Sequence, residues 1–232
     1  MSLSLHSPAS WAGAVRDAAA LLLPVACAGC SAPGTSLCDL CRGEIVAHPV
    51  THEVGGLAPV TTALRFEGVT ASALRRFKSD PRPQLARAFA PALREALVAC
   101  AVRTRVLALA VPVPDQAASL RRRGFRPVEQ LMHLAGVAPT RSLRWVRTPS
   151  DQRALGADER AANLDGALRA ARALDGVDVV VVDDIVTTGA TIREAQRALA
   201  SAGANVVGAV ALARTPKRHS EPYRDPFQSL PK

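Results

Sequence analysis

The sequence predicts an α/β fold, a parallel sheet with helices on both faces, preceded by a small cysteine module. Three observations support this prediction. Apolar runs typical of buried strands recur along the chain, segments with helical spacing separate them, and four cysteines come in two close pairs near the N-terminus. Strands that alternate with helices favour a parallel sheet. A chain of 232 residues can form one main domain with a small appendage.

The expected elements alternate along the main domain. We expect strands over 58–66, 105–113, 141–147, 179–182 and 205–213, and helices over 70–78, 84–100, 125–134 and from about Thr191 onward. The helix over 84–100 is predicted by apolar residues at helical spacing, such as Leu85, Phe89 and Leu93.

Four regions are expected along the chain. They are an N-terminal helix (1–24), a cysteine module (25–57), the main domain (58–214) and a disordered basic tail (215–232). Residues 18–27 could also be read as a bacterial lipoprotein signal, but the apolar run is short and Asp17 lies at its start. No other stretch reaches the length of a membrane span, so we expect a cytoplasmic protein.

Composition limits the possible partners. The formal net charge of +9 favours anionic partners such as phosphates or nucleic acid. Only 3% of the residues are aromatic, so platforms that bind single strands by base stacking are not expected.

Four of the five cysteines form two C-x-x-C pairs, Cys27 with Cys30 and Cys38 with Cys41. Two such turns can place four thiolates around one tetrahedral Zn²⁺, which we expect to be structural. Two disulfides or unoccupied thiols are the alternatives, but disulfides belong to an oxidising compartment, and no export signal is apparent. The fifth, Cys100, is expected in the core.

The most informative motif begins as a buried strand and ends as a helix. Val179–Val182 are β-branched, two carboxylates follow at Asp183 and Asp184, and a turn of small and hydroxylated residues follows these. The turn comprises Thr187, Thr188, Gly189, Ala190 and Thr191. Its backbone N–H groups and the helix dipole favour an anion. Because two carboxylates would repel a bare phosphate, the motif predicts a ribose 5-phosphate, whose hydroxyls donate to the carboxylates.

This motif closely resembles the phosphoribosyl pyrophosphate (PRPP) motif of type I phosphoribosyltransferases. Other segments narrow the match: the two C-x-x-C pairs, Phe77–Asp80, Val111–Pro114, Arg121–Arg126, and Gln152 with Arg160 and Asn163 occur in the order seen in the ComF family. The resemblance implies a type I phosphoribosyltransferase-like sheet, PRPP bound with Mg²⁺, and a role in competence and DNA uptake. It leaves open whether the protein catalyses phosphoribosyl transfer.

Two segments, 115–126 and 148–163, lack periodicity and are expected to be loops beside this site. By resemblance, Val113, Pro114, Asp115 and Gln116 correspond to the loop that holds pyrophosphate. The basic residues Lys78, Arg121, Arg122, Arg123 and Arg126 could contact pyrophosphate, contact a nucleic-acid backbone or form a solvated face, and all three roles stay open. Residues 148–163 resemble a lid that closes over PRPP, in which Arg153 and Arg160 would neutralise the leaving group; an ordinary surface loop is the alternative.

Two hypotheses of different classes follow. The first is a zinc-containing protein that binds PRPP or a ribose 5-phosphate compound, with Asp183 and Asp184, and with them Arg153 and Arg160, as candidate catalytic residues. The second is a non-enzymatic module that interacts with single-stranded DNA or with competence proteins. No membrane partner is expected in either case.

Overall fold

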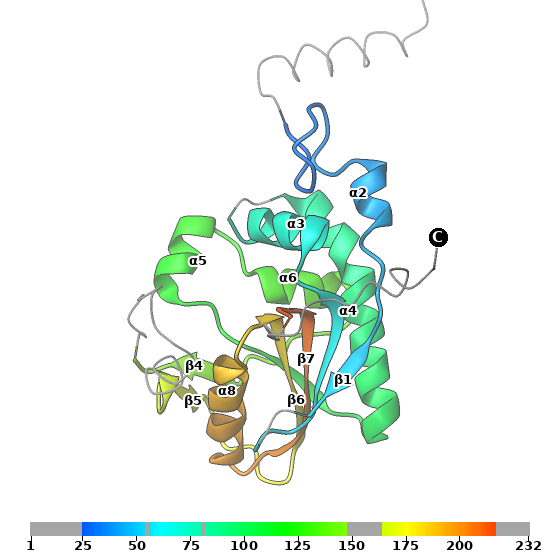
Figure 1. Cartoon of the computed structure of the whole chain (residues 1–232). Coiled ribbons are helices and arrows are strands. Elements are labelled where there is room, and N and C mark those ends of the chain that lie inside the picture. Colours follow the sequence, from blue (N-terminus) through cyan, green and yellow to red (C-terminus); the bar gives the residue numbers. More distant parts are fainter. Residues whose placement is uncertain (1–24, 54–55, 80–81, 148–163, 217–232) are drawn as a thin grey trace, which may run out of the picture.

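The computed structural model describes residues 25–53, 56–79, 82–147 and 164–216 (Figure 1). Its main sheet has the strand order β1-β2-β7-β6-β3. These strands are β1 (Val50–His52), β2 (Val60–Arg65), β7 (Asn205–Arg214), β6 (Asp178–Val186) and β3 (Leu109–Pro112). The last four run parallel to their neighbours, and β1 is antiparallel to β2. The predicted N-terminal helix, the lid segment and most of the tail lie outside the described residues.

Helices cover both faces of this sheet, as predicted. Alternate residues of β6 enter two separate cores: Val180 and Val182 pack with Leu85 and other residues of one helical layer, whereas Val179 and Val181 pack with Ile192 on the opposite face. The first layer contains α3 (Gly68–Ser79), α4 (Pro83–Thr104) and α6 (Pro127–Leu134), and the second contains α8 (Ala190–Ala200). Burial on both faces explains why Val179–Val182 of β6 are all apolar. The α/β class with a mainly parallel sheet is confirmed.

A separate antiparallel ribbon was not predicted. The strand expected over 141–147 is found as β4 (Leu143–Trp145), but it pairs with β5 (Leu168–Ala170) and not with the main sheet. The ribbon packs its Leu143 and Leu168 against the α8 side of the core. Three-residue strands are too short to show period-two alternation in the sequence, which is why β5 escaped prediction.

Two other expectations need correction. The strand predicted over 105–113 begins only at Leu109, because Arg105 takes a left-handed conformation (φ +57°) that ends α4, and Leu107 is fully exposed. The segment after Asp115, expected as a loop without periodicity, contains the helix α5 (Ala117–Arg123). No residue of α5 is buried, so the sequence has no apolar stripe to indicate it.

The cysteine module packs on α3. Its short helix is α2 (Asp39–Gly43), and its Cys27 and Cys41 share a core with Leu74 and Phe77 of α3. At Gly29 an added Cβ would lie 2.6 Å from Cys41 Sγ and 2.9 Å from Val69 Cγ1, so this contact tolerates no side chain. Two further hydrogen bonds join the module to the helical layer: Arg76 donates to Ser31, and Arg82 donates to the Ala26 carbonyl.

Candidate functional site

The carboxyl end of β6 carries the two aspartates of the predicted motif. Asp184 is buried and Asp183 is half-buried, and the chain then turns through Thr187 and Thr188 into α8. Gly189 takes a left-handed conformation (φ +79°) immediately before the helix, which a residue with a side chain adopts only at a cost. The motif therefore forms a strand, turn and helix, with the helix beginning at Ala190.

The amino end of α8 presents free backbone donors. Gly189 at the cap has no side chain, and no side-chain cap hydrogen bond is present. The one nearby contact is long, with the Ala190 N–H 3.4 Å from Thr188 Oγ1. Unsatisfied N–H groups at the positive end of an 11-residue helix are suited to bind a phosphate.

The two aspartates differ in their surroundings. Lys78 Nζ, from the last turn of α3, lies 2.9 Å from Asp184 Oδ1. Burial alone would lower the pKa of Lys78, but the charge and hydrogen bond of Asp184 outweigh it, so the pKa lies above its ordinary value. The sequence indicated Lys78 only as a possible phosphate or nucleic-acid contact, because no pattern connects residues 106 positions apart.

Asp183 has no such direct partner among the described side chains. Its Oδ1 accepts the backbone N–H of Asp184 at 2.8 Å. Burial, reinforced by the negative charge of Asp184, raises the pKa of Asp183 to about 7, although Lys78 acts in the opposite direction. Near neutral pH this carboxyl group can therefore either accept a hydrogen bond from a hydroxyl group or hold a proton.

The predicted pyrophosphate loop lies beside this pair. The Val113 N–H donates to the Val182 carbonyl at 2.9 Å, so the loop leaves β3 next to the end of β6. Asp115 and Arg123 form an ion pair at 3.2 Å, in which both side chains are nearly buried. Burial raises the pKa of Asp115 even though Arg123 opposes this, and the charge of Asp184 adds to the increase. These charged groups thus form one cluster at the carboxyl edge of the sheet.

The predicted basic residues lie in three different surroundings. Lys78 and Arg123 belong to this charged cluster, and Arg126 lies 3.8 Å from Glu129. Arg121 and Arg122 are exposed on α5. Arg153 and Arg160 lie outside the described residues.

One position that the sequence did not indicate is Trp145. Its indole N–H donates to the Pro114 carbonyl at 2.7 Å, which fastens the β4–β5 ribbon to the predicted pyrophosphate loop. Trp145 is half-buried, and a tryptophan removed from solvent usually needs such an acceptor, but the sequence alone does not show which acceptor it has.

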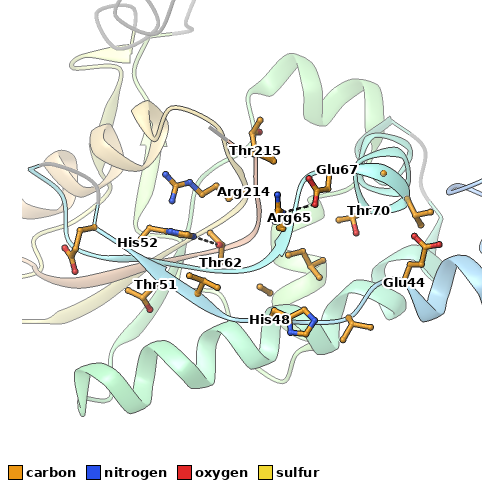
Figure 2. A pocket seen from close by; sticks show the side chains of 18 residues that line it. Glu44, His48, Thr51, His52, Thr62, Arg65, Glu67, Thr70, Arg214 and Thr215 are labelled. Atoms are coloured by element: carbon orange, nitrogen blue, oxygen red, sulfur yellow. Dashed lines mark hydrogen bonds and ion pairs between the residues drawn. The ribbon is translucent and has the colours of Figure 1, made fainter. Parts of the chain in front are cut away.

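A cavity of about 880 Å³ is lined by β1, the segment before it and β2, and it reaches the carboxyl ends of β2 and β7 (Figure 2). Arg65 of β2 pairs in register with Arg214 of β7, which pairs with Val186 of β6, so the cavity begins within two strands of the phosphate turn. Arg65 forms an ion pair with Glu67 at the start of α3, and His52 contacts Thr62 at 3.2 Å. The buried hydroxyl of Thr215 has no hydrogen-bond partner among the described residues.

The four predicted cysteines come together in one cluster. Their sulfur atoms all lie within 4.8 Å of one another, and Cys38 Sγ is 3.7 Å from Cys27 Sγ and 3.8 Å from Cys30 Sγ. A tetrahedral Zn²⁺ with bonds of about 2.3 Å requires sulfurs about 3.8 Å apart, whereas a disulfide requires about 2.05 Å. The spacing therefore fits a metal ion, and all four cysteines are free.

Backbone donors around Cys27 also suit a metal site. The Cys38 N–H points at Cys27 Sγ at 3.4 Å. Burial would raise the pKa of Cys27, but the N–H groups of Cys30, Cys38 and Gly29 lower it to about 6. The cluster does not include His48 or His52.

Comparison with known proteins agrees with this architecture. A sequence model described as "Phosphoribosyl transferase domain" matches residues 119–230. The matched residues, which include the motif at 179–191, are therefore similar to a phosphoribosyl transferase domain.

The chain is also homologous to the DNA utilization protein YhgH. It is 34% identical to the protein from Salmonella typhi over 117 residues, which cover 45% of this chain and 52% of the relative. It is 36% identical to the Salmonella typhimurium protein over 99 residues, which cover 40% of this chain and 44% of the relative. The chain thus spans about half the length of the curated relatives that it matches. These matches confirm the predicted resemblance to a ComF-like protein with a phosphoribosyltransferase fold.

Among solved structures, the chain is similar to the crystal structure of a hypoxanthine phosphoribosyltransferase from Staphylococcus aureus. The TM-score is 0.31 and the identity 12%, with 61% of this chain and 71% of that chain covered. Similarity this weak does not by itself define a fold. None of the described helices is long and apolar enough to cross a membrane.

Proposed function

We propose that the carboxyl ends of β3 and β6 bind PRPP or another ribose 5-phosphate compound together with Mg²⁺. The observation that carries this proposal is the juxtaposition of Asp183 and Asp184 with the uncapped amino end of α8. The 5-phosphate accepts hydrogen bonds from the turn at 187–191, and the ribose hydroxyls donate to the two carboxylates. An acidic pair beside an anion site suits a ligand that carries both hydroxyls and phosphate.

The pyrophosphate of PRPP would lie against residues 113–116. Arg123 is held near that loop by Asp115, and Lys78 partly neutralises the aspartates. Both cations reduce the repulsion between the carboxylates and an anionic ligand. Bound Mg²⁺ supplies further positive charge to the pyrophosphate. Arg153 and Arg160 remain predicted lid residues.

The neighbouring cavity offers space for a second ligand. We propose that an acceptor, where there is one, occupies the space near Arg65, Arg214 and Thr215. Transfer would break the bond between ribose C1 and a pyrophosphate oxygen and form a bond from C1 to the acceptor. Asp183 and Asp184 would then hold the ribose while positive charge develops on it. Binding and turnover are separate proposals, because a chain that binds PRPP can lack an acceptor.

We also propose that Cys27, Cys30, Cys38 and Cys41 bind one structural Zn²⁺. Four thiolates complete a closed tetrahedral site, which gives stability and leaves no position for catalysis. The contact of this module with α3 supports a structural role.

For the cellular role, we propose handling of DNA during competence and uptake, in the cytoplasm. The homologous relatives named "DNA utilization protein" support this role. A non-enzymatic interaction with single-stranded DNA or competence proteins is the second candidate. The net charge of +9 favours it.

Isothermal titration calorimetry tests ligand binding directly. We expect the full chain to bind PRPP with Mg²⁺, and to bind it more weakly without. Asp183→Asn combined with Asp184→Asn should abolish binding while the circular dichroism spectrum stays unchanged. The matched control is Asp39→Asn combined with Asp175→Asn, which removes two exposed carboxylates and should bind as the wild type does. Wild-type affinity in the first variant would refute the ribose assignment.

A further inference from the structure

A second basic site lies between the β4–β5 ribbon and α8. A groove of about 560 Å³ runs between β5 and the carboxyl half of α8, and we call it the β5–α8 groove. Among the described residues, three arginines line it, Arg169, Arg172 and Arg197, and no carboxylate does. The remaining lining residues are small or apolar, for example Gly166, Ala173, Ala198 and Ser201. Because these lining side chains are small, an extended anion can approach the guanidinium groups.

Arg197 is held in place at one wall of this groove. Its Nε and Nη2 donate to the two carboxylate oxygens of Glu194 at 2.7 and 2.8 Å, and Nη2 also donates to the Leu168 carbonyl at 3.0 Å. Glu194 in turn accepts the Leu168 N–H at 2.8 Å. Nη1 has no partner among the described residues, so its two N–H groups remain available to a ligand.

The other arginines are not neutralised. Arg169 lies directly opposite Arg144 in the register of the β4–β5 ribbon, and both side chains are exposed. Like charges in directly opposed positions destabilise a strand pair. Arg144, Arg169 and Arg172 form no ion pair with any described residue. An anionic partner would remove the repulsion that the ribbon carries on its own.

We infer that the β5–α8 groove binds the phosphodiester backbone of a nucleic-acid strand. Arginine is well suited to phosphate because its planar fork of donors matches two oxygens. No aromatic residue lines the groove in the part of the chain that the structure describes, so contact is to the backbone, independent of sequence and dependent on salt. This inference deepens the proposed role in DNA handling by assigning it a surface.

The groove is separate from the sugar-phosphate site. Arg197 follows Ala190 by seven residues along α8, which places it about 10 Å from the amino end of the helix at 1.5 Å per residue. Both ligands can therefore be bound at the same time. The exposed α5 arginines, Arg121 and Arg122, lie beside the predicted pyrophosphate loop, and they provide the natural comparison.

The test compares two variants that each lose two exposed arginines, Arg169→Ala with Arg172→Ala, and Arg121→Ala with Arg122→Ala. Binding of a labelled 20-nucleotide oligothymidylate to the full chain is followed by fluorescence anisotropy at several salt concentrations. The groove variant should bind about 10-fold more weakly at low salt, and its salt slope should fall by up to about 1.4, or 0.7 for each phosphate contact. The α5 variant should bind the oligonucleotide as the wild type does.

Any other outcome of the anisotropy experiment contradicts the inference. Equal losses in both variants would mean that net charge alone attracts DNA, and a loss confined to the α5 variant would move the interface to α5. Competition by thymidine monophosphate at the same phosphate concentration would indicate a site for free phosphates. The thermal unfolding midpoint should not fall in the groove variant, because the removed charges repel one another.

A parallel titration separates this inference from the ligand proposal. The groove variant should bind PRPP with wild-type affinity. If the wild type bound DNA through the groove but bound no PRPP, the proposed ligand site would fail while the groove assignment stood.

Discussion

Lys78 Nζ lies 2.9 Å from Asp184 Oδ1, so an ion pair joins the last turn of α3 to the carboxyl end of β6. The first turn of the same helix contacts the cysteine module, where Val69 lies against Gly29 and Cys41. One 12-residue helix therefore contacts both the cysteine cluster and the candidate ribose site. The cysteine module thus helps to fix the position of a charge in the ligand site.

Substitution of Lys78 tests the importance of that charge. Lys78→Met should weaken PRPP binding at least 10-fold, because two carboxylates then face an anionic ligand without their neighbouring cation. Lys78 is 37% exposed, so we expect only about 1–2 kcal/mol loss in unfolding free energy. Arg87→Met removes an exposed cation from α4 and is the control for calorimetry and denaturation. Equal affinity in the two variants would contradict the role of Lys78.

The raised pKa of Asp183 predicts a stability that depends on pH. Its pKa is about 7 in the folded chain and about 3.9 in the unfolded chain, so the folded state binds more protons between these values. Stability therefore falls as pH rises through this window, and Asp183→Asn should remove that loss. By linkage the loss between pH 5 and pH 8 is about 2–3 kcal/mol, so differential scanning fluorimetry should show an unfolding midpoint gain for Asp183→Asn that is about 5–10 °C larger at pH 8 than at pH 5. A gain independent of pH would show that Asp183 titrates normally.

Loss of the metal should unfold the cysteine module. Elemental analysis of the purified protein should give about one equivalent of zinc, and Cys27→Ser with Cys38→Ser should abolish it. Metal binding contributes on the order of 10 kcal/mol to the folding of such modules, so hydrogen exchange should increase throughout 25–44 and on the face of α3 beneath it. Cys100→Ser removes a thiol outside the cluster and should retain the metal. Metal retained in the double variant would place it elsewhere.

Two glycine substitutions test the packing of this module. Gly29→Ala places a methyl group 2.6 Å from Cys41 Sγ, and we expect a cost of about 1–3 kcal/mol together with weaker metal retention. Gly43→Ala meets no atom within 4 Å and lies in α2, so it should be neutral or stabilise by up to about 1 kcal/mol. Chemical denaturation and a chelator challenge measure both effects. Similar behaviour of the two variants would show that the module does not pack on α3 in this way.

The sequence predicted features that depend on local pattern. The β-branched run before Asp183 indicated a strand buried on both faces, and the spacing of Leu85, Phe89 and Leu93 indicated α4. The four cysteines were predicted to cluster because C-x-x-C turns restrict where their thiols can lie. In each case the physical reason lies in residues that are close together in the sequence, so these features could be predicted without knowledge of the rest of the fold.

Features that depend on tertiary contact were not predictable. The partner of Asp184 lies 106 residues earlier, and the acceptor of the Trp145 indole lies 31 residues earlier. Helix α5 buries nothing and therefore has no apolar period. The like-charged pair of Arg144 and Arg169 depends on a strand register that three-residue strands do not encode. The candidate site combines both kinds of feature, which is why its residue types were expected but their pairings were not.

The strand order also has a consequence for how copies of the chain meet in concentrated solution. The longest strands, β6 with nine residues and β7 with ten, lie inside the main sheet, while its edge strands β1 and β3 have three and four. Short edges are poor templates for pairing with another chain. Pro112 further removes a donor from β3, and the Thr140 N–H occupies the Ala110 carbonyl at 2.8 Å. The sheet thus keeps its most strongly β-forming sequence away from the positions where edge-to-edge aggregation begins.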